Sequence, residues 1–353
     1  MDIVHLSVHR VTGLISLPDN ADCELLHSPA TRVRAWLTMN RETPFLHLKR
    51  CAAYDRMIAQ MLVDKSTGPL AAPDRFAQAL TATTILEGIR WDRPLLLIEA
   101  CGTVDPVDGG RIDDMGTCGL GLRLFDPTTL VDAGKIALDA AIAGIALMLP
   151  PHTTPTVEAL GTVGYAVESP SGRFLYSLES SASGSITPFT SIDAGRLGEI
   201  PSAVERLFKS ADLRTVVHLL SRSLQTTDDL QAFLTAWAAL EVFLDKAFKT
   251  YKPKIYTQLK AGVAAAAVPF VERLQKVIEE DARYNVRDKF VVVSSFLNSV
   301  DAGADLTMFV GLKKQRDGIH DMKSPAGGYR ASATQGLLRK YLRLFLGMSP
   351  TTA

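Results

Sequence analysis

Cysteine is scarce in this chain, and the cysteines that occur form no metal-binding pattern. The 353 residues include four: Cys23, Cys51, Cys101 and Cys118. No CxxC pair or zinc-finger spacing connects them, so the sequence predicts no structural metal. Few, unpaired thiols are typical of a protein that works in a reducing compartment, and we expect a cytoplasmic location.

Long apolar runs and a secretion leader are also missing. The longest apolar stretch, residues 136–149, has about 14 residues and includes Asp139, which makes it too short to cross a bilayer. The first residues (MDIVH) have the pattern of a strand and lack the positive charge of a leader peptide. We therefore expect no association with a membrane.

The signatures of cofactor-binding enzymes are not found. The sequence has no glycine-rich phosphate loop, no dinucleotide-binding fingerprint and no nucleophile elbow, so it predicts no cofactor. Four aspartates crowd a glycine-containing segment: Asp105, Asp108, Asp113 and Asp114. They lack the alternate spacing of a calcium loop, and a turn explains the same composition.

The chain has no net charge, but its two halves differ. Residues 201–353 contain 22 Lys and Arg against 15 Asp and Glu, a net charge of +7. Residues 1–200 contain 16 against 23, a net charge of −7. A basic C-terminal half fits a polyanionic substrate such as RNA, although an uneven distribution by chance explains a difference of this size too.

Apolar periodicity divides the chain in the same place. Alternating patterns predict strands over residues 1–16, 33–37, 95–100, 118–125, 157–167 and 174–178, with a helix over 128–149. After an uncharged Ser/Gly/Thr-rich linker at 180–191, helical patterns prevail over 204–210, 213–224, 230–250, 271–281, 306–320 and 332–346. The sequence thus predicts an α+β protein. A mixed, strand-rich domain over residues 1–190 precedes an all-α helical-bundle domain over residues 200–353.

A long amphipathic helix is predicted after Thr226-Thr227-Asp228-Asp229, a run with the composition of a helix start. Apolar residues then recur in steps of three and four, at Leu230, Phe233, Trp237, Leu240, Leu244 and Phe248. Glu241 falls on the edge of this stripe, where a carboxylate needs a partner. We expect a cation such as Arg316 to be that partner.

Arg316 and His320 lie in the segment 312–321 (LKKQRDGIHD), between two apolar helical stretches. Four positions apart in a helix, they would share one face. A permanent cation beside a group that titrates near neutrality suits phosphodiester cleavage, because the base removes a proton and the cation stabilises the developing charge. The alternative is a solvated helix end whose basic residues complement the helix dipole.

The order of these elements resembles the HEPN superfamily, and in particular its Apea-like HEPN domains. Residues 233–241 (FLTAWAALE) are similar to the family's early helix, which often ends in Leu-Glu. Residues 316–320 (RDGIH) resemble its signature of Arg, a polar residue and His, and a closing amphipathic helix follows. The resemblance covers residues 210–348. It implies a helical domain that dimerises and a metal-independent ribonuclease that acts in antiviral defence or as a toxin.

The resemblance also implies a role for each residue of a composite active site at the dimer interface. His320 would be the base, Arg316 would stabilise the charge on the phosphate, Asp317 would orient its neighbours, and Glu241 would position Arg316. The partners would be RNA and a second copy of the chain. The N-terminal domain would be a sensor or substrate selector that responds to a phage-derived or other trigger.

Basic residues with interleaved tyrosines are candidates for RNA binding. The set comprises Lys313, Lys314, Lys252, Lys254 and Tyr251, with Lys249, Lys260 and Tyr256 close by in the sequence. Lysines would hold phosphates, and tyrosines could stack on bases. A solvated basic connection between helices accounts for the lysines at 249–260 equally well.

The spacing of the Arg–His pair leaves alternatives open. Only three residues separate Arg316 from His320, fewer than the family usually has, and one residue rotates a helical position by roughly 100°. The chain is then either an active nuclease with a shortened motif or a non-catalytic HEPN-fold scaffold that dimerises or binds nucleic acid. A third interpretation, an enzyme in the N-terminal domain, ranks last because residues 1–200 contain no recognisable catalytic set.

Overall fold

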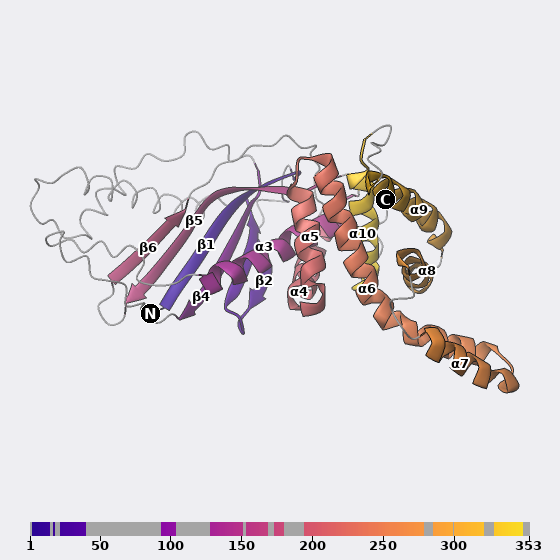
Figure 1. Cartoon of the computed structure of the whole chain (residues 1–353). Helices are drawn as coiled ribbons and strands as arrows, with labels where there is room; N and C mark the ends of the chain where they lie inside the picture. The colour runs from indigo at the N-terminus through magenta and orange to yellow at the C-terminus, as the bar shows by residue number, and fades with distance from the viewer. Residues whose placement is uncertain are drawn as a thin grey trace, which may run out of the picture. The chain divides into compact units, whose positions relative to one another are not determined.

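A computed structural model of the chain contains a β-sheet followed by a series of helices (Figure 1). It describes residues 2–14, 17, 22–39, 93–103, 128–150, 153–168, 173–179, 194–278, 285–298, 300–320 and 328–348. The aspartate-rich segment 105–114, the predicted strand 118–125 and the predicted linker 180–191 lie outside these residues. The α+β class predicted from the sequence is confirmed.

Six antiparallel strands form one sheet in the order β2-β3-β4-β1-β5-β6. They are β1 (Asp2–Thr12), β2 (Asp22–Ser28), β3 (Val33–Thr38), β4 (Leu95–Thr103), β5 (Thr156–Glu168) and β6 (Arg173–Glu179). The sequence predicted all of these except β2. That strand lies at the edge of the sheet and shifts register between Glu24 and Leu26, which interrupts the alternation that marks a strand.

The central strand β1 has buried side chains on both faces. On one face Leu6 and Val8 pack with Leu95 and Leu97 of β4. The other face, which includes His5, lies against α3 (Thr128–Met148), where a Cβ atom on Gly134 would come within 3.6 Å of His5 Nδ1. A Cβ atom on Gly102 of the neighbouring strand β4 would come within 2.9 Å of Leu130 Cδ2, so a larger residue there requires the Leu130 side chain to move.

His5 and His9 have no third ligand near them in the sequence, which predicts half-buried surface residues. The structure corrects this, because both are buried, with 8% and 7% of their surface exposed. His9 Nε2 lies 3.0 Å from Ser7 Oγ. Burial, and secondly the neighbouring His5, lowers the pKa of His9 to about 4. His9 is therefore a neutral core residue at physiological pH.

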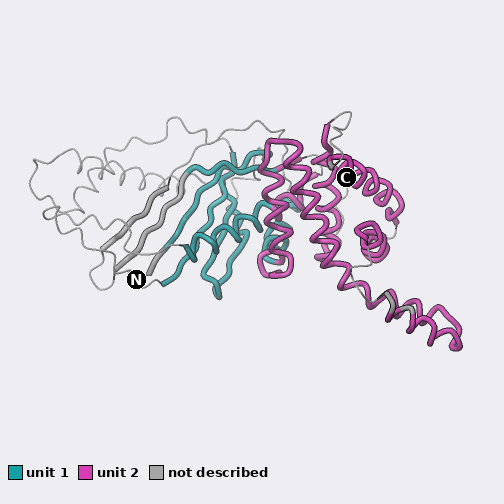
Figure 2. The backbone as a smooth tube through the Cα atoms, viewed as in Figure 1, with its two compact units in different colours: residues 1–142, 155–205 teal, residues 143–154, 206–353 magenta. Residues whose placement is uncertain are grey.

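The chain folds into two compact units (Figure 2). The strand unit comprises residues 1–142 and 155–205, and the helical unit comprises residues 143–154 and 206–353. The end of α3 therefore belongs to the helical unit, although its beginning packs on the sheet. Among the described residues, no helix is long and apolar enough to span a membrane.

Two buried arginines of α10 (Ala331–Phe345) hold the segment that ends α3. Arg339 donates hydrogen bonds to the backbone oxygens of Ala146, Leu149, Pro150 and Thr153. Arg343 donates to Leu147 O at 3.1 Å. The last carbonyls of a helix have no partner within it and carry the negative end of its dipole, so both arginines cap α3.

The rest of the described helical part has the following elements in chain order. They are α4 (Ala194–Lys209), η2 (Ala211–Leu213), α5 (Arg214–Gln225), α6 (Asp229–Gly262), η3 (Ala265–Ala267), α7 (Val268–Ile278), α8 (Val286–Leu297) and α9 (Ala302–His320), followed by α10. The sequence predicted each α-helix of the helical unit except α8, whose run of three valines favours a strand. The sequence nonetheless contains a signal for the start of α8, because Asn285 and Asp288 form a capping box.

The helix α6 forms the centre of the helical unit. Asp228 caps it as predicted, accepting a hydrogen bond from Gln231 N at 2.6 Å. Its predicted apolar stripe is buried from Phe233 to Phe248. Aromatic rings then connect it to its neighbours, because Trp237 stacks on Phe309 of α9 and Phe309 stacks on Phe290 of α8.

Candidate functional site

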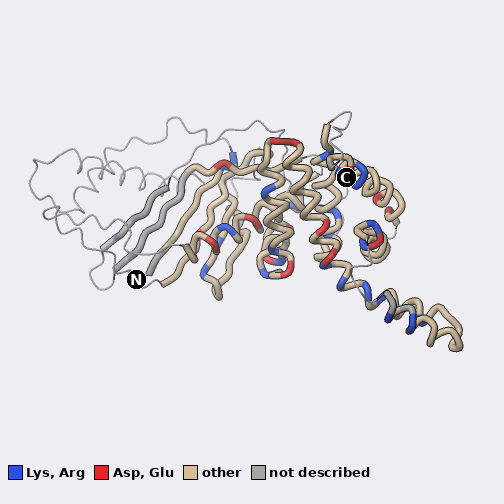
Figure 3. Tube along the Cα trace, viewed as in Figure 1, with Lys and Arg blue, Asp and Glu red and all other residues tan. Residues whose placement is uncertain are grey.

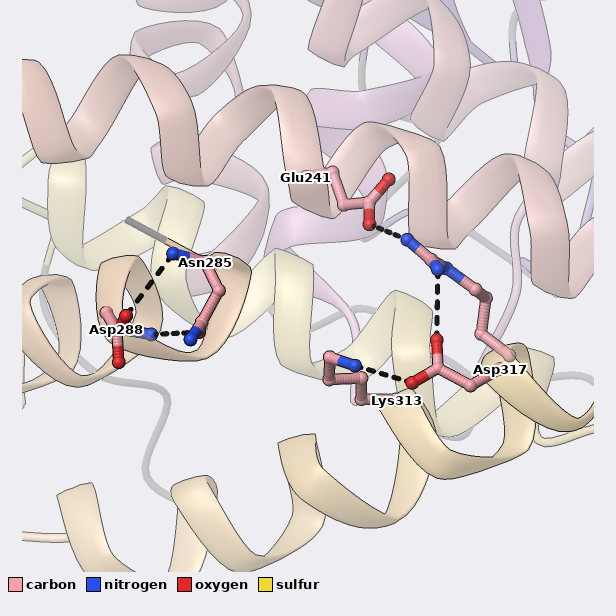
Figure 4. A network of polar contacts seen from close by, with 6 residues as sticks. Glu241, Asn285, Asp288, Lys313 and Asp317 are labelled. Atoms are coloured by element: carbon pink, nitrogen blue, oxygen red, sulfur yellow. Dashed lines mark hydrogen bonds and ion pairs between the residues drawn. The ribbon is translucent and has the colours of Figure 1, made fainter. Parts of the chain in front are cut away.

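The apolar stripe of α9 leads directly to Arg316. Phe309 and Leu312 on this helix are fully buried, and Arg316 follows Leu312 by one helical turn. Arg316 therefore points back toward α6, where its Nη2 donates to Glu241 Oε1 at 2.5 Å (Figure 4). The predicted partnership is confirmed, although the two side chains are part-exposed, at 27% and 30%, rather than buried.

Asp317 connects Arg316 to a second cation. Its Oδ1 accepts from Arg316 Nη1 at 2.9 Å, and its Oδ2 accepts from Lys313 Nζ at 2.5 Å (Figure 4). The pKa of Asp317 is lowered, chiefly because Lys313 donates a hydrogen bond to the charged carboxylate. The positive charges of Lys313 and Arg316 act in the same direction, while partial burial opposes them. Two cations and two carboxylates thus form one chain: Lys313, Asp317, Arg316 and Glu241.

An aromatic ring supports the guanidinium of Arg316. Its Cζ lies 5.7 Å from the centroid of Trp237, one turn before Glu241 on α6. Trp237 is itself held against Phe309, with ring centroids 5.3 Å apart. The apolar periodicity of the sequence predicts Trp237 only as a core residue. Its second role, as a cation–π support, follows from its position on the side of the stripe next to Glu241.

Gln315 of α9 binds the segment that comes just before α10. This amide donates from Nε2 to Gly328 O at 2.9 Å and accepts at Oε1 from Arg330 N at 3.1 Å. Tyr329, between those two residues, stacks on Phe233 of α6 with ring centroids 5.9 Å apart. The sequence does not predict this role of Gln315, because no local pattern indicates a contact with residues 13 and 15 positions further along the chain.

The segment from Arg316 to His320 is helical throughout. His320 is the last residue of α9, and the helix continues through Gly318 without a break. Arg316 and His320 are therefore at positions i and i+4 of one helix, the relation that places two residues on the same face. A Cβ atom on Gly318 would meet nothing within 4 Å, so packing does not require glycine there.

The proposed RNA-binding residues fall into two groups. Lys313 and Lys314 lie on α9, where Lys313 holds Asp317 and Lys314 is exposed. Lys252 and Lys254 lie on the second half of α6, among the basic residues that continue into α7 (Figure 3). They follow Glu241 by more than ten residues, which corresponds to about 16–20 Å along a helix. The structure does not bring this group to Arg316.

Tyr251 is occupied by packing. Its ring stacks on Phe296 of α8 with centroids 5.2 Å apart and an interplanar angle of 12°. Lys254 Nζ lies 4.9 Å from the centroid of the same ring. A nucleobase could stack on Tyr251 only by displacing one of these neighbours. The predicted role of this tyrosine as a base platform is therefore not favoured by its surroundings.

Among the residues that the structure describes, no group of three His, Cys, Asp or Glu side chains is placed to hold a metal ion. The described site can hold an anion on the exposed Lys314, and on Lys313 and Arg316 only where the anion replaces Asp317. Comparison of the chain with protein-family models, with curated proteins and with solved structures gives no match.

Proposed function

We propose that this chain is a metal-independent RNA endonuclease of the HEPN type, which acts in defence or as a toxin. The observation that carries the proposal is the setting of Arg316. A cation that is held by Glu241 and Asp317 and supported by Trp237 lies on the helix that ends in His320. An arginine oriented by two carboxylates is suited to bind a phosphate in a defined direction.

Each residue has a definite part in the proposed reaction. His320 removes the proton of a ribose 2′-hydroxyl, and the resulting oxygen attacks the adjacent phosphorus atom. Arg316 stabilises the negative charge that develops on the phosphate oxygens. Glu241 fixes the direction of the guanidinium from α6, and Asp317 orients Arg316 and Lys313 from α9.

The proposed site needs two copies of the chain. Expelling the 5′-oxygen requires an acid, while attack by the 2′-oxygen requires a base, and one His320 is available per chain for both steps. In a homodimer through the helical unit, two Arg316–His320 pairs would supply base, acid and charge stabilisation. The strand unit would then sense a phage-derived or other trigger, or select the substrate.

RNA cleavage in the presence of EDTA tests the proposal. Wild type should cleave RNA under these conditions, and His320→Ala and Arg316→Ala should each abolish cleavage without changing the melting temperature by more than a few degrees. His218→Ala is the matched control, because His218 is an exposed histidine on α5 of the same unit. Equal cleavage by wild type and His320→Ala would show that this motif is not the active site.

A non-catalytic scaffold is the second candidate, and the charge balance of the site favours it. The four charges of Lys313, Asp317, Arg316 and Glu241 cancel, so the described cluster has no excess positive charge. The short Arg–His spacing points the same way. A scaffold predicts dimerisation or salt-sensitive RNA binding with no cleavage by wild type.

A further inference from the structure

The carboxylate of Asp317 occupies the two cations that a phosphate would need. Its two oxygens accept from different groups, Lys313 Nζ at 2.5 Å and Arg316 Nη1 at 2.9 Å. The other terminal nitrogen of Arg316, Nη2, is taken by Glu241 from α6. An approaching anion therefore finds neither Lys313 nor the outer edge of Arg316 available until Asp317 moves.

A phosphate presents the same chemistry as this carboxylate. Two anionic oxygens on one phosphorus atom can accept from a lysine and an arginine together. The phosphate then supplies the negative charge that Asp317 supplied before it was displaced. We propose that Lys313 and Arg316 form a binding site for a backbone phosphate of single-stranded nucleic acid. Asp317 orients both cations while no phosphate is bound and so fills this site as an internal competitor. Cleavage rests on the proposed function, whereas this exchange of one anion for another does not.

Asp317, and not Glu241, is the carboxylate that would leave. Asp317 is the more exposed of the two, with 43% of its side chain accessible against 30% for Glu241. Its bond to Lys313 is an i, i+4 pair on a helix surface, a kind of contact that changes an equilibrium by only about twofold. Glu241 reaches Arg316 from a different helix and would keep the guanidinium in place during the exchange.

The competitor lowers the apparent affinity for the phosphate. Only molecules in which Asp317 has turned away can bind, so the measured Kd equals the intrinsic value divided by that fraction. Substituting asparagine keeps the size of the side chain and removes its charge. Asp317→Asn should therefore bind nucleic acid more tightly, the opposite of what losing a supporting residue would do.

The probe is a fluorescently labelled single-stranded DNA of about ten nucleotides, a length that spans one protein surface of this kind. DNA lacks the 2′-hydroxyl, so binding is measured by anisotropy without cleavage. Asp317→Asn should lower the Kd at least about threefold, because two partly exposed cations become available. One additional phosphate contact should also steepen the dependence of log K on log salt by about 0.7.

Asp301→Asn is the matched control. Asp301 pairs with Lys340 at 3.1 Å immediately before α9, so its substitution makes the same change of charge without touching Arg316. The proposal requires that the Kd of this variant stays at the wild-type value. Equal tightening by both variants would mean that net charge alone sets the affinity, and it would overturn the proposal.

A second pair of variants keeps the test decisive if Asp317→Asn folds poorly. Asp317→Ser should tighten binding in the same way. Lys313→Ala should weaken binding more in the Asp317→Ser background than in wild type, since Lys313 is free to bind the phosphate only there. Unchanged or weaker binding by folded Asp317 variants would refute the competitor. Tighter binding without RNA cleavage by any form would support the anion site and refute the nuclease.

Discussion

The ion pair between Glu241 and Arg316 makes a quantitative prediction about stability and activity. Glu241→Ala removes the acceptor of Arg316 Nη2 and leaves Asp317 on Nη1. Trp237 remains beneath the guanidinium. Arg316 would therefore lose its ion pair with α6 but keep the contact with Trp237 and the ion pair with Asp317 on its own helix. The direction of the guanidinium changes, and its charge does not.

The expected cost follows from the contact and its exposure. A hydrogen bond to a charged group contributes about 1.5–3 kcal/mol when it is well shielded from water. Both side chains are nearly one-third exposed and Arg316 keeps a second carboxylate, so solvent screening reduces this to about 1–2 kcal/mol. For a unit the size of residues 143–154 and 206–353, the melting temperature should fall by about 2–8 °C.

Guanidinium chloride unfolding measures the cost, with Asp245→Ala as the control. Asp245 lies one turn after Glu241 on α6 and pairs with Lys289 at 2.6 Å, but it is more than half exposed. Its removal should cost no more than about 0.5 kcal/mol. The rate of RNA cleavage by Glu241→Ala should fall by more than the loss of folded protein accounts for, because the Arg316 guanidinium no longer has its direction. Wild-type stability together with wild-type cleavage would refute this account of Glu241.

Other predictions concern the two units and the proposed dimer. The pKa of His9 is lower in the folded chain than its ordinary value of 6.5, so the unfolded state binds a proton that the folded state does not between pH 6.5 and about 4. Stability should fall by about 3 kcal/mol as the pH decreases through this window, and His9→Gln should flatten the dependence measured by urea unfolding at each pH. Arg339→Met leaves buried carbonyl groups at the end of α3 without their donor and should cost on the order of 3–5 kcal/mol, with Arg339→Lys less severe in the same assay. If the active site is shared, a mixture of Arg316→Ala and His320→Ala chains should regain part of the cleavage that each has lost, and a mixture that stays inactive would argue against a composite site.

Features that depend on residues close in the sequence could be predicted from it. The stripe from Phe233 to Phe248 follows from helical periodicity alone, and the cap at Asp228 follows from the side chain's bond to a backbone group three residues on. The link between Glu241 and Arg316 could also be inferred. A carboxylate at the edge of a buried stripe and a cation on the stripe of another helix need each other wherever the helices meet.

The environment of each site residue was decided by tertiary packing. Tyr251 looks like a surface tyrosine among lysines in the sequence, yet α8 brings Phe296 against its ring. The end of α3 belongs to the helical unit because Arg339, far away on α10, supplies the donors that its last carbonyls lack. Contacts of this kind join residues separated by tens to hundreds of positions, and their energies depend on shape and burial after folding rather than on local propensity. The sequence thus determines most of the helices and their buried faces, while the packing of those faces decides what surrounds each residue.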